Sequence, residues 1–170
     1  MTSCRSSSFE SRCRARIRSP RTASRARTTS RSASSPLLGT RTEEAIINAD
    51  PQAVYDVLTD GQKFAAATGM PAQLSAREGE TFTLFDGRVE GRQIELVPGQ
   101  RIVQAWRFGA THPSVWEAGV YSVVRFTLIG QEDGTRFIID HAGVPPEWHD
   151  HISTGYPNFY QQPLERYFAA

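Results

Sequence analysis

The chain has 170 residues, the size of one ordinary domain, and its formal net charge is +1. Hydrophobic residues make up 39% and aromatic residues 10%, so the chain can build a core and is not wholly disordered. No apolar run approaches the roughly 18–20 residues that a membrane-spanning helix needs, which excludes an integral membrane protein of that kind. No apolar stretch follows the basic N-terminal residues, so a secretory signal peptide is not expected either.

The near-neutral net charge conceals two segments of opposite charge. Residues 1–40 hold nine Arg, eleven Ser and a single acid, and their few apolar side chains cannot offset an ordering entropy of roughly 1–2 kcal/mol per residue. They predict a disordered Arg/Ser-rich tail. Residues 41–170 carry ten bases, seventeen acids and all but one of the aromatic residues, so this acidic segment is expected to form the folded domain.

Three interpretations of the tail stay open. Its Arg-rich, Ser-rich and acid-poor composition is typical of an organelle transit peptide, although an amphipathic apolar face is missing. Clustered Arg could neutralise phosphates, but no aromatic residues alternate with them for base stacking, so nucleic acid is not an expected partner. The plain alternative is a solvated extension without function. A cytoplasmic protein is therefore expected, with an organelle as the alternative if residues 1–40 are a transit peptide.

Both cysteines, Cys4 and Cys13, lie in the tail. Their spacing matches no zinc-binding pattern, and no histidine lies near them in the sequence. The domain itself contains no cysteine, which excludes a disulfide framework there and fits a reducing compartment.

The first part of the domain predicts one strand and two short helices. The strand is expected over 41–48. Asp50 can then accept hydrogen bonds from free N–H groups at a helix start, and apolar residues at helical spacing carry this helix over 51–59. A second short helical turn is expected over 64–68, ending at Gly69.

Strand signals dominate the middle of the domain. Alternating apolar residues predict strands over 81–85, 88–97, 101–108, 120–129 and 135–141. Asp-Gly and Pro-Gly pairs close the first two hairpins, because these residues suit tight turns. Hairpins in succession, with no crossover helix between them, indicate an antiparallel sheet.

The last segment changes to helical spacing. Apolar and aromatic residues recur every three or four positions from Ile152 to Phe168, which predicts an amphipathic helix. Pro157 and Pro163 lie inside it and are expected to kink it or split it into shorter pieces. The element order is therefore β-α-α-β(5–6)-α. It predicts an α+β domain in which a curved antiparallel sheet wraps around a long C-terminal helix and buries the apolar faces of both.

Several short motifs occur in a fixed order along the domain. They are Asp50-Pro51-x-x-Val54-Tyr55, GRVEGRQIELVPGQRIVQAWRF from Gly87 to Phe108, Trp116-x-x-Gly119-x-Tyr121-Ser122, Gly134-Thr135, Asp140-His141-x-Gly143-x-Pro145, and Gly155-Tyr156 followed by Tyr160-x-x-Pro163-Leu164-x-x-Tyr167. Together they resemble the C-terminal domain of the activators of the heat-shock protein 90 ATPase, in the START-like (SRPBCC, helix-grip) superfamily. The resemblance covers roughly residues 41–168.

The resemblance implies a helix-grip fold with a cavity between the sheet and the C-terminal helix. Members of this superfamily include co-chaperones, carriers of lipids and other hydrophobic ligands, and aromatase or cyclase enzymes, so the fold alone does not select one function. The eukaryotic activators also carry a separate N-terminal domain that engages the chaperone, where this sequence has the tail. Relatives often have Gly-Trp and an uninterrupted helix where this chain has Tyr156-Pro157.

The inward-facing positions of the expected strands and helix define a candidate ligand cavity. Its expected lining residues are Phe82, Leu84, Gln104, Trp106, Phe108, Ser122, Val124, Phe126, Ile139, His141, Tyr156 and Tyr160. A few polar groups in an apolar pocket orient a ligand such as a polyketide, sterol or fatty acid, and Gln104, Ser122 and His141 are the candidates. Alternatively, the apolar side chains are core residues, and the polar ones bond to the backbone or lie at the rim.

Catalysis and metal binding are not the expected functions. His141 is the best catalytic candidate because neutral imidazole can move protons near pH 7, and Tyr121 or Tyr160 could donate a proton in a cyclase-like reaction. His149 and His151 are two residues apart, so on a helix they point in different directions and cannot share a metal ion. In an extended segment they could, with His112 and Glu117 of another loop as further candidate ligands. No cofactor is expected, since the sequence has no glycine-rich loop that would cradle a phosphate.

Three functions follow from these observations. The first is a START-like single domain of the activator family that binds a hydrophobic small molecule in its cavity or acts as a stress-response factor. The alternative is a co-chaperone-type module whose acidic surface contacts heat-shock protein 90 and stimulates its ATPase. The second alternative is an enzyme of the cyclase or hydrolase type that uses the same cavity.

Overall fold

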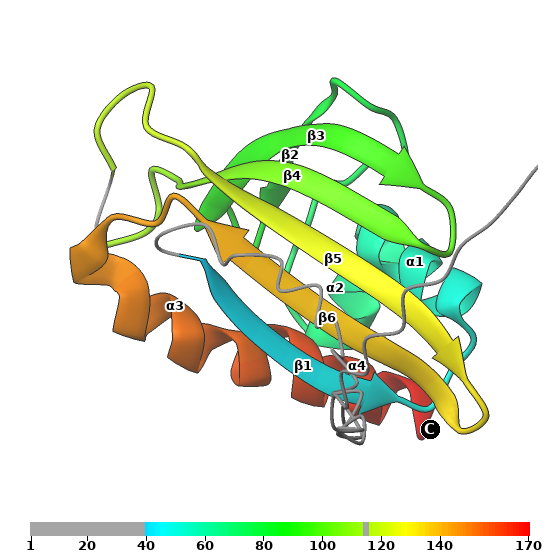
Figure 1. Cartoon of the computed structure of the whole chain (residues 1–170). Helices are drawn as coiled ribbons and strands as arrows, with labels where there is room; N and C mark the ends of the chain where they lie inside the picture. The colour runs from blue at the N-terminus through cyan, green and yellow to red at the C-terminus, as the bar shows by residue number, and fades with distance from the viewer. Residues whose placement is uncertain (1–39, 114–115) are drawn as a thin grey trace, which may run out of the picture. The chain divides into compact units, whose positions relative to one another are not determined.

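The computed structural model describes residues 40–113 and 116–170. The predicted tail, residues 1–40, lies outside the described residues except for Thr40, so its disorder, its function and the location of the protein stay predictions. From Arg41 onward the chain folds as an α+β domain in which one curved sheet lies against the C-terminal helical segment (Figure 1). Among the described residues, no helix has the length and apolar character needed to cross a membrane.

All six strands belong to one antiparallel sheet with the order β1-β6-β5-β4-β3-β2. Their bounds are β1 Arg41–Ile47, β2 Thr81–Leu84, β3 Val89–Val97, β4 Arg101–Phe108, β5 Ser122–Gln131 and β6 Gly134–Ala142. Each expected strand lies within two residues of these bounds. Strands β2 to β6 follow one another as hairpins, as predicted, while β1 pairs with β6 and brings the start of the domain beside its last strand.

The inward face of the sheet follows the predicted alternation. On β4 every second residue is buried, namely Ile102, Gln104, Trp106 and Phe108. On the neighbouring β3, a Cβ atom at Gly91 would lie 2.0 Å from the carbonyl oxygen of Ala105 and 2.6 Å from the ring of Phe82. Because the backbone of β4 and the ring of Phe82 both pack directly against this position, only glycine fits there.

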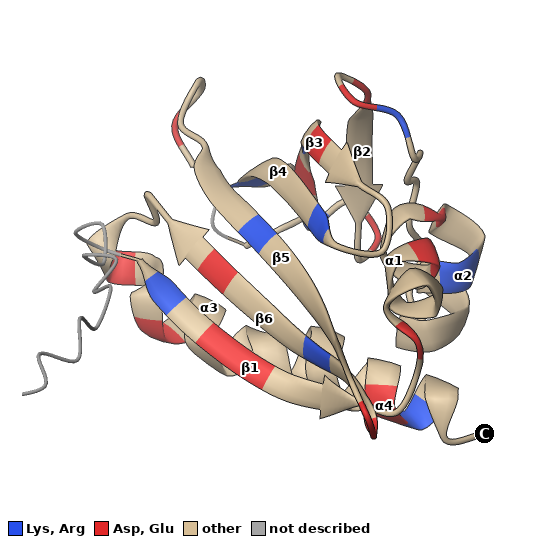
Figure 2. Ribbon diagram, turned by 45° about the vertical axis from the view of Figure 1, so that its right-hand side comes forward, with Lys and Arg blue, Asp and Glu red and all other residues tan. Residues whose placement is uncertain are grey.

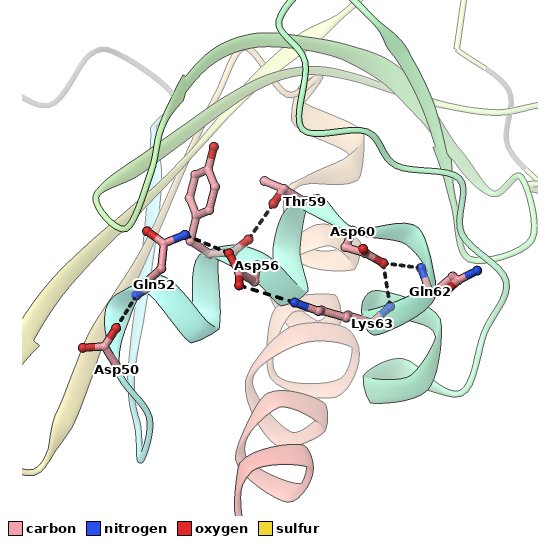
Figure 3. A network of polar contacts seen from close by, with 8 residues as sticks. Asp50, Gln52, Asp56, Thr59, Asp60, Gln62 and Lys63 are labelled. Atoms are coloured by element: carbon pink, nitrogen blue, oxygen red, sulfur yellow. Dashed lines mark hydrogen bonds and ion pairs between the residues drawn. The ribbon is translucent and has the colours of Figure 1, made fainter.

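Helix α1 (Pro51–Thr59) begins at the predicted cap. The carboxylate of Asp50 accepts a hydrogen bond of 2.8 Å from the backbone N–H of Gln52, which satisfies one of the free donors at the helix start (Figure 3). The apolar residues of α1 are buried, and the helix contacts β5 and β6. The helix therefore covers one end of the core.

Helix α2 (Gly61–Thr68) begins three residues earlier than predicted. The carboxylate of Asp60 accepts hydrogen bonds from the backbone N–H groups of Gln62 at 2.8 Å and Lys63 at 3.0 Å, so a new helix starts directly after α1 (Figure 3). The helix ends where it was expected to end, at Gly69, which has a left-handed backbone with φ of 72°.

The C-terminal helical segment keeps the same direction through both prolines. It consists of the short 3₁₀ turn η1 (Pro146–Trp148), α3 (His149–Tyr156), the π-helical turn η2 (Pro157–Gln161) and α4 (Gln162–Phe168). The helix is thus divided into shorter pieces as expected, but the pieces differ in helix type and no loop separates them. In an α-helix the ring of Pro163 would clash with the carbonyl four residues earlier, and we attribute the wider π turn that precedes it to this constraint.

One face of this helical segment packs against the inward face of the sheet. Its buried residues Ile152, Tyr156, Tyr160 and Leu164 recur at four-residue intervals. The ring of Tyr160 stacks against Trp106 of β4 with 6.0 Å between ring centroids. The predicted helix-grip architecture, a curved antiparallel sheet around a C-terminal helix, is therefore confirmed (Figure 1).

Candidate functional site

A cavity of about 340 Å³ lies between the sheet and the C-terminal helical segment. Four parts of the chain form its wall. They are the β2–β3 turn with the start of β3 (Phe85, Arg88, Val89), the end of β4 (Trp106, Phe108), the segment after β4 (His112, Pro113), and the helices from η1 to η2 (Trp148, His151, Ile152, Gly155, Tyr156, Phe159, Tyr160). Most of these side chains are aromatic, so the wall is largely apolar.

Four of the twelve residues that were predicted to line a cavity do line it, namely Trp106, Phe108, Tyr156 and Tyr160. The other eight are buried in the core without lining it, namely Phe82, Leu84, Gln104, Ser122, Val124, Phe126, Ile139 and His141. The structure therefore brings all twelve together in one core, but it places the three polar candidates behind the cavity wall.

The buried glutamines form a short hydrogen-bonded chain behind Trp106. The indole N–H of Trp106 donates to Oε1 of Gln104 at 2.8 Å, and Nε2 of Gln104 donates to Oε1 of Gln93 at 3.0 Å. Nε2 of Gln93 ends the chain on the backbone carbonyl of Ser75 at 3.2 Å. Gln104 therefore holds the indole ring in the cavity wall, and both of its polar side-chain atoms have partners.

His141 is the centre of a second buried polar group. Its Nε2 lies 2.6 Å from Oγ of Ser122, and its Nδ1 is hydrogen-bonded to the hydroxyl of Tyr156. Oγ of Ser122 donates in turn to the backbone carbonyl of Trp106 at 3.4 Å. One assignment of protons satisfies every atom: Tyr156 donates to Nδ1, Nε2–H donates to Ser122, and Ser122 donates to the carbonyl.

Burial sets the protonation of this group. It lowers the pKa of His141 to about 3, with a smaller contribution from nearby His149, because a buried imidazolium loses its hydration. Burial also raises the pKa values of Tyr156 and Tyr160 well above the ordinary 10.0 of tyrosine. All three side chains are therefore uncharged at neutral pH. The group can order the wall of the cavity through hydrogen bonds, and it supplies neither an imidazolium acid nor a phenolate base.

An aromatic cluster forms the rim of the cavity beside η1. The ring of His112 stacks on Phe108 with ring centroids 3.9 Å apart. His151 lies edge-on to both, 5.7 Å from Phe108 and 5.3 Å from His112. Trp148 lies edge-on to Phe108 at 5.5 Å and to His151 at 6.0 Å. Side chains from the end of β4, from the segment after it and from the helices thus meet beside Phe108.

The sequence patterns indicated this rim only in part, because most of its residues come from loops and from a helix instead of alternating strands. The signals were the pair His149 and His151 and the further candidate ligand His112. His149 donates from Nε2 to the carbonyl of Val144 at 2.9 Å, whereas His151 lines the cavity, so the two point to different surroundings as helical spacing predicted. Within residues 40–113 and 116–170, no three side chains of His, Cys, Asp or Glu are grouped closely enough to hold a metal ion.

Comparison with curated proteins identifies relatives over this same domain. The chain is 29% identical over 118 residues to the human protein named activator of 90 kDa heat shock protein ATPase homolog 1. This alignment covers 69% of this chain and 33% of the human protein. It is 32% identical over 96 residues to the Dictyostelium discoideum protein named activator of 90 kDa heat shock protein ATPase homolog. That alignment covers 56% of this chain and 24% of the Dictyostelium protein. The chain thus spans about a third or less of the length of these curated relatives.

Solved structures share the fold at lower sequence identity. A Mesorhizobium loti protein aligns with a TM-score of 0.63 and 21% identity over 75% of this chain and 95% of that chain. An HSP90 activator from Plasmodium falciparum aligns with a TM-score of 0.61 and 20% identity over 72% of this chain and 89% of that chain. The family model described as activator of Hsp90 ATPase homolog 1-like protein matches residues 48–169. The chain therefore belongs to the family of activator of Hsp90 ATPase homolog 1-like proteins.

Proposed function

We propose that the domain binds a hydrophobic small molecule in the cavity between the sheet and the C-terminal helical segment. The observation that carries this proposal is a space of about 340 Å³ with a mainly aromatic wall. Small-molecule sites are concave, mostly apolar and about 300–1,000 Å³ in volume, so this cavity lies at the lower end of that range.

Some of the aromatic side chains in the wall also reach solvent. Phe159 is 38% exposed, and its ring centroid lies 5.2 Å from that of Phe85 in the same wall. Apolar surface in contact with water costs roughly 25 cal/mol per Å², and a bound apolar molecule would remove part of this surface from water. The wall therefore suits a flat aromatic or aliphatic ligand of modest size.

Gly155 offers a way to fill the cavity without disturbing the fold. It lies in α3 and lines the cavity, and a Cβ atom there would make only an ordinary contact of 3.6 Å with the ring of Phe159. Gly155→Leu is expected to weaken the binding of the neutral probe N-phenyl-1-naphthylamine about tenfold or more, because the added side chain takes the space of the ligand. The matched control, Gly155→Ala, adds a single methyl group and is expected to retain binding.

The measurement is a fluorescence titration of the probe with the full chain, together with thermal unfolding of each variant. Both substitutions replace glycine within a helix, so neither is expected to lower the unfolding temperature. Saturable binding that Gly155→Leu weakens and Gly155→Ala retains would support the cavity as the site. A wild-type chain that shows no saturable binding, or equal binding by Gly155→Leu, would overturn the proposal.

A chaperone partner is the second candidate function. The similarity to proteins named activators of the 90 kDa heat shock protein ATPase favours it. The test measures ATP hydrolysis by heat-shock protein 90 from the same organism with and without the full chain. We expect saturable stimulation that Gly155→Leu retains, since a chaperone would contact the outside of the domain. Unchanged hydrolysis together with no detectable binding would reject this function.

A further inference from the structure

Arg88 is the one permanently charged side chain among the described residues that line the cavity. Apart from tyrosines, the ionisable residues that line it are Arg88, His112 and His151, and no described Asp or Glu lines it. This contrasts with the domain as a whole, since residues 41–170 carry seven more acids than bases. We propose that the cavity selects an apolar molecule with one anionic group, which Arg88 holds at the rim. This inference rests on the proposed function, the binding of a hydrophobic ligand, and adds that the ligand carries a negative charge.

Arg88 has no competing partner within the part of the chain that the structure describes. It is exposed, it directly precedes β3, and it takes part in none of the ion pairs between described residues. Six of the nine arginines in residues 41–170 do form such pairs. Figure 2 shows acidic and basic segments side by side on β1, β6 and β5, where two of these pairs lie. A guanidinium without a carboxylate partner at the mouth of an apolar cavity is suited to an anion.

The described acidic residues that neighbour the wall in the sequence do not line the cavity themselves. Glu90 of β3 pairs with Arg107 at 3.2 Å, and Asp150 of α3 pairs with Arg41 at 3.3 Å. Asp86, in the turn before β3, and Glu147 of η1 are exposed and do not line the cavity. The described wall of the cavity therefore carries one positive charge and no negative charge, which favours a negatively charged group.

His151 adds a donor beside an apolar surface. Its ring centroid lies 5.3 Å from that of His112, and the ring of His112 stacks on Phe108. An imidazole ring carries at least one N–H donor whether it is neutral or charged. An anionic group at the rim can therefore accept hydrogen bonds there, while the apolar part of the ligand lies against the aromatic wall.

Two probes that differ in a single group test this inference. 8-Anilinonaphthalene-1-sulfonate is N-phenyl-1-naphthylamine with one added sulfonate. The wild-type full chain is expected to bind the sulfonate about tenfold more tightly than the neutral probe, since hydrogen bonds to charged groups are among the stronger ones in proteins. Arg88→Gln is expected to remove most of this preference and to change the affinity of the neutral probe far less. The control Arg92→Gln removes the same charge from an exposed position of β3 that does not line the cavity, and it should keep the preference.

The outcomes separate this inference from the function on which it rests. Equal affinities of the two probes for the wild-type chain, or equal effects of Arg88→Gln and Arg92→Gln on the sulfonate, would overturn the selection of anions and leave hydrophobic binding standing. Binding of the sulfonate that Gly155→Leu does not weaken would place it outside the cavity and would also overturn the inference. If neither probe binds, the proposed function fails together with it.

Discussion

The Tyr156→Phe variant is expected to lose about 1–3 kcal/mol of unfolding free energy, whereas Tyr160→Phe, four residues later, is expected to lose none. Both side chains are almost fully buried. The hydroxyl of Tyr156 is hydrogen-bonded to Nδ1 of His141, so its removal leaves a buried acceptor without a donor. The hydroxyl of Tyr160 has no hydrogen-bond partner among the described residues, so its removal leaves nothing unsatisfied and removes a desolvated polar group.

His141 cannot compensate for the loss of the Tyr156 hydroxyl by moving its proton. A proton on Nδ1 would have no acceptor, and Ser122 would then have to donate to Nε2 instead of to the carbonyl of Trp106. One buried polar atom remains unsatisfied in either tautomer. Urea unfolding of the two variants and the wild type at pH 7 measures the difference. A loss in Tyr160→Phe that equals or exceeds the loss in Tyr156→Phe would contradict this assignment of hydrogen bonds.

Mild acid is expected to destabilise the domain through His141. Its pKa is about 3 in the folded protein and 6.5 for an ordinary histidine. Between these values the unfolded chain binds the proton and the folded chain does not, so the free energy of unfolding falls as the pH falls. From pH 7 to pH 5 this one histidine is expected to remove about 2 kcal/mol of stability.

Urea unfolding of the wild type and of His141→Gln at the two pH values tests this expectation. The wild type should lose about 2 kcal/mol more than the variant, because glutamine does not titrate and all carboxylates are common to both proteins. The substitution also breaks the bonds to Ser122 and Tyr156, so a second measurement uses the wild type alone. The NMR shift of the His141 ring carbon Cε1 should stay constant from pH 7 to pH 5. A titration midpoint above pH 5 would refute the lowered pKa.

Much of the fold could be predicted because the relevant interactions are local. Asp50 caps α1 through the N–H of a residue two positions away, and the alternation of β4 places Trp106 and Phe108 on the buried face of the sheet. The early start of α2 has the same local origin, since Asp60 could have been recognised as a cap from the sequence alone. The π turn before Pro163 is different: the two prolines indicated a disturbed helix, and the folded chain shows that the helix continues with a wider turn.

The candidate site was predictable only in part, because alternation identifies a buried face but not the partners on it. Gln104 and His141 face inward as predicted, and the tertiary structure shows that their polar atoms bond within the core behind Trp106 and Tyr156. The residues at the rim, from Arg88 to His151, lie on segments that are far apart in the chain. Their meeting depends on how the C-terminal helical segment packs against the sheet. That packing is the sum of many long-range contacts, which residue spacing within a single strand or helix does not encode.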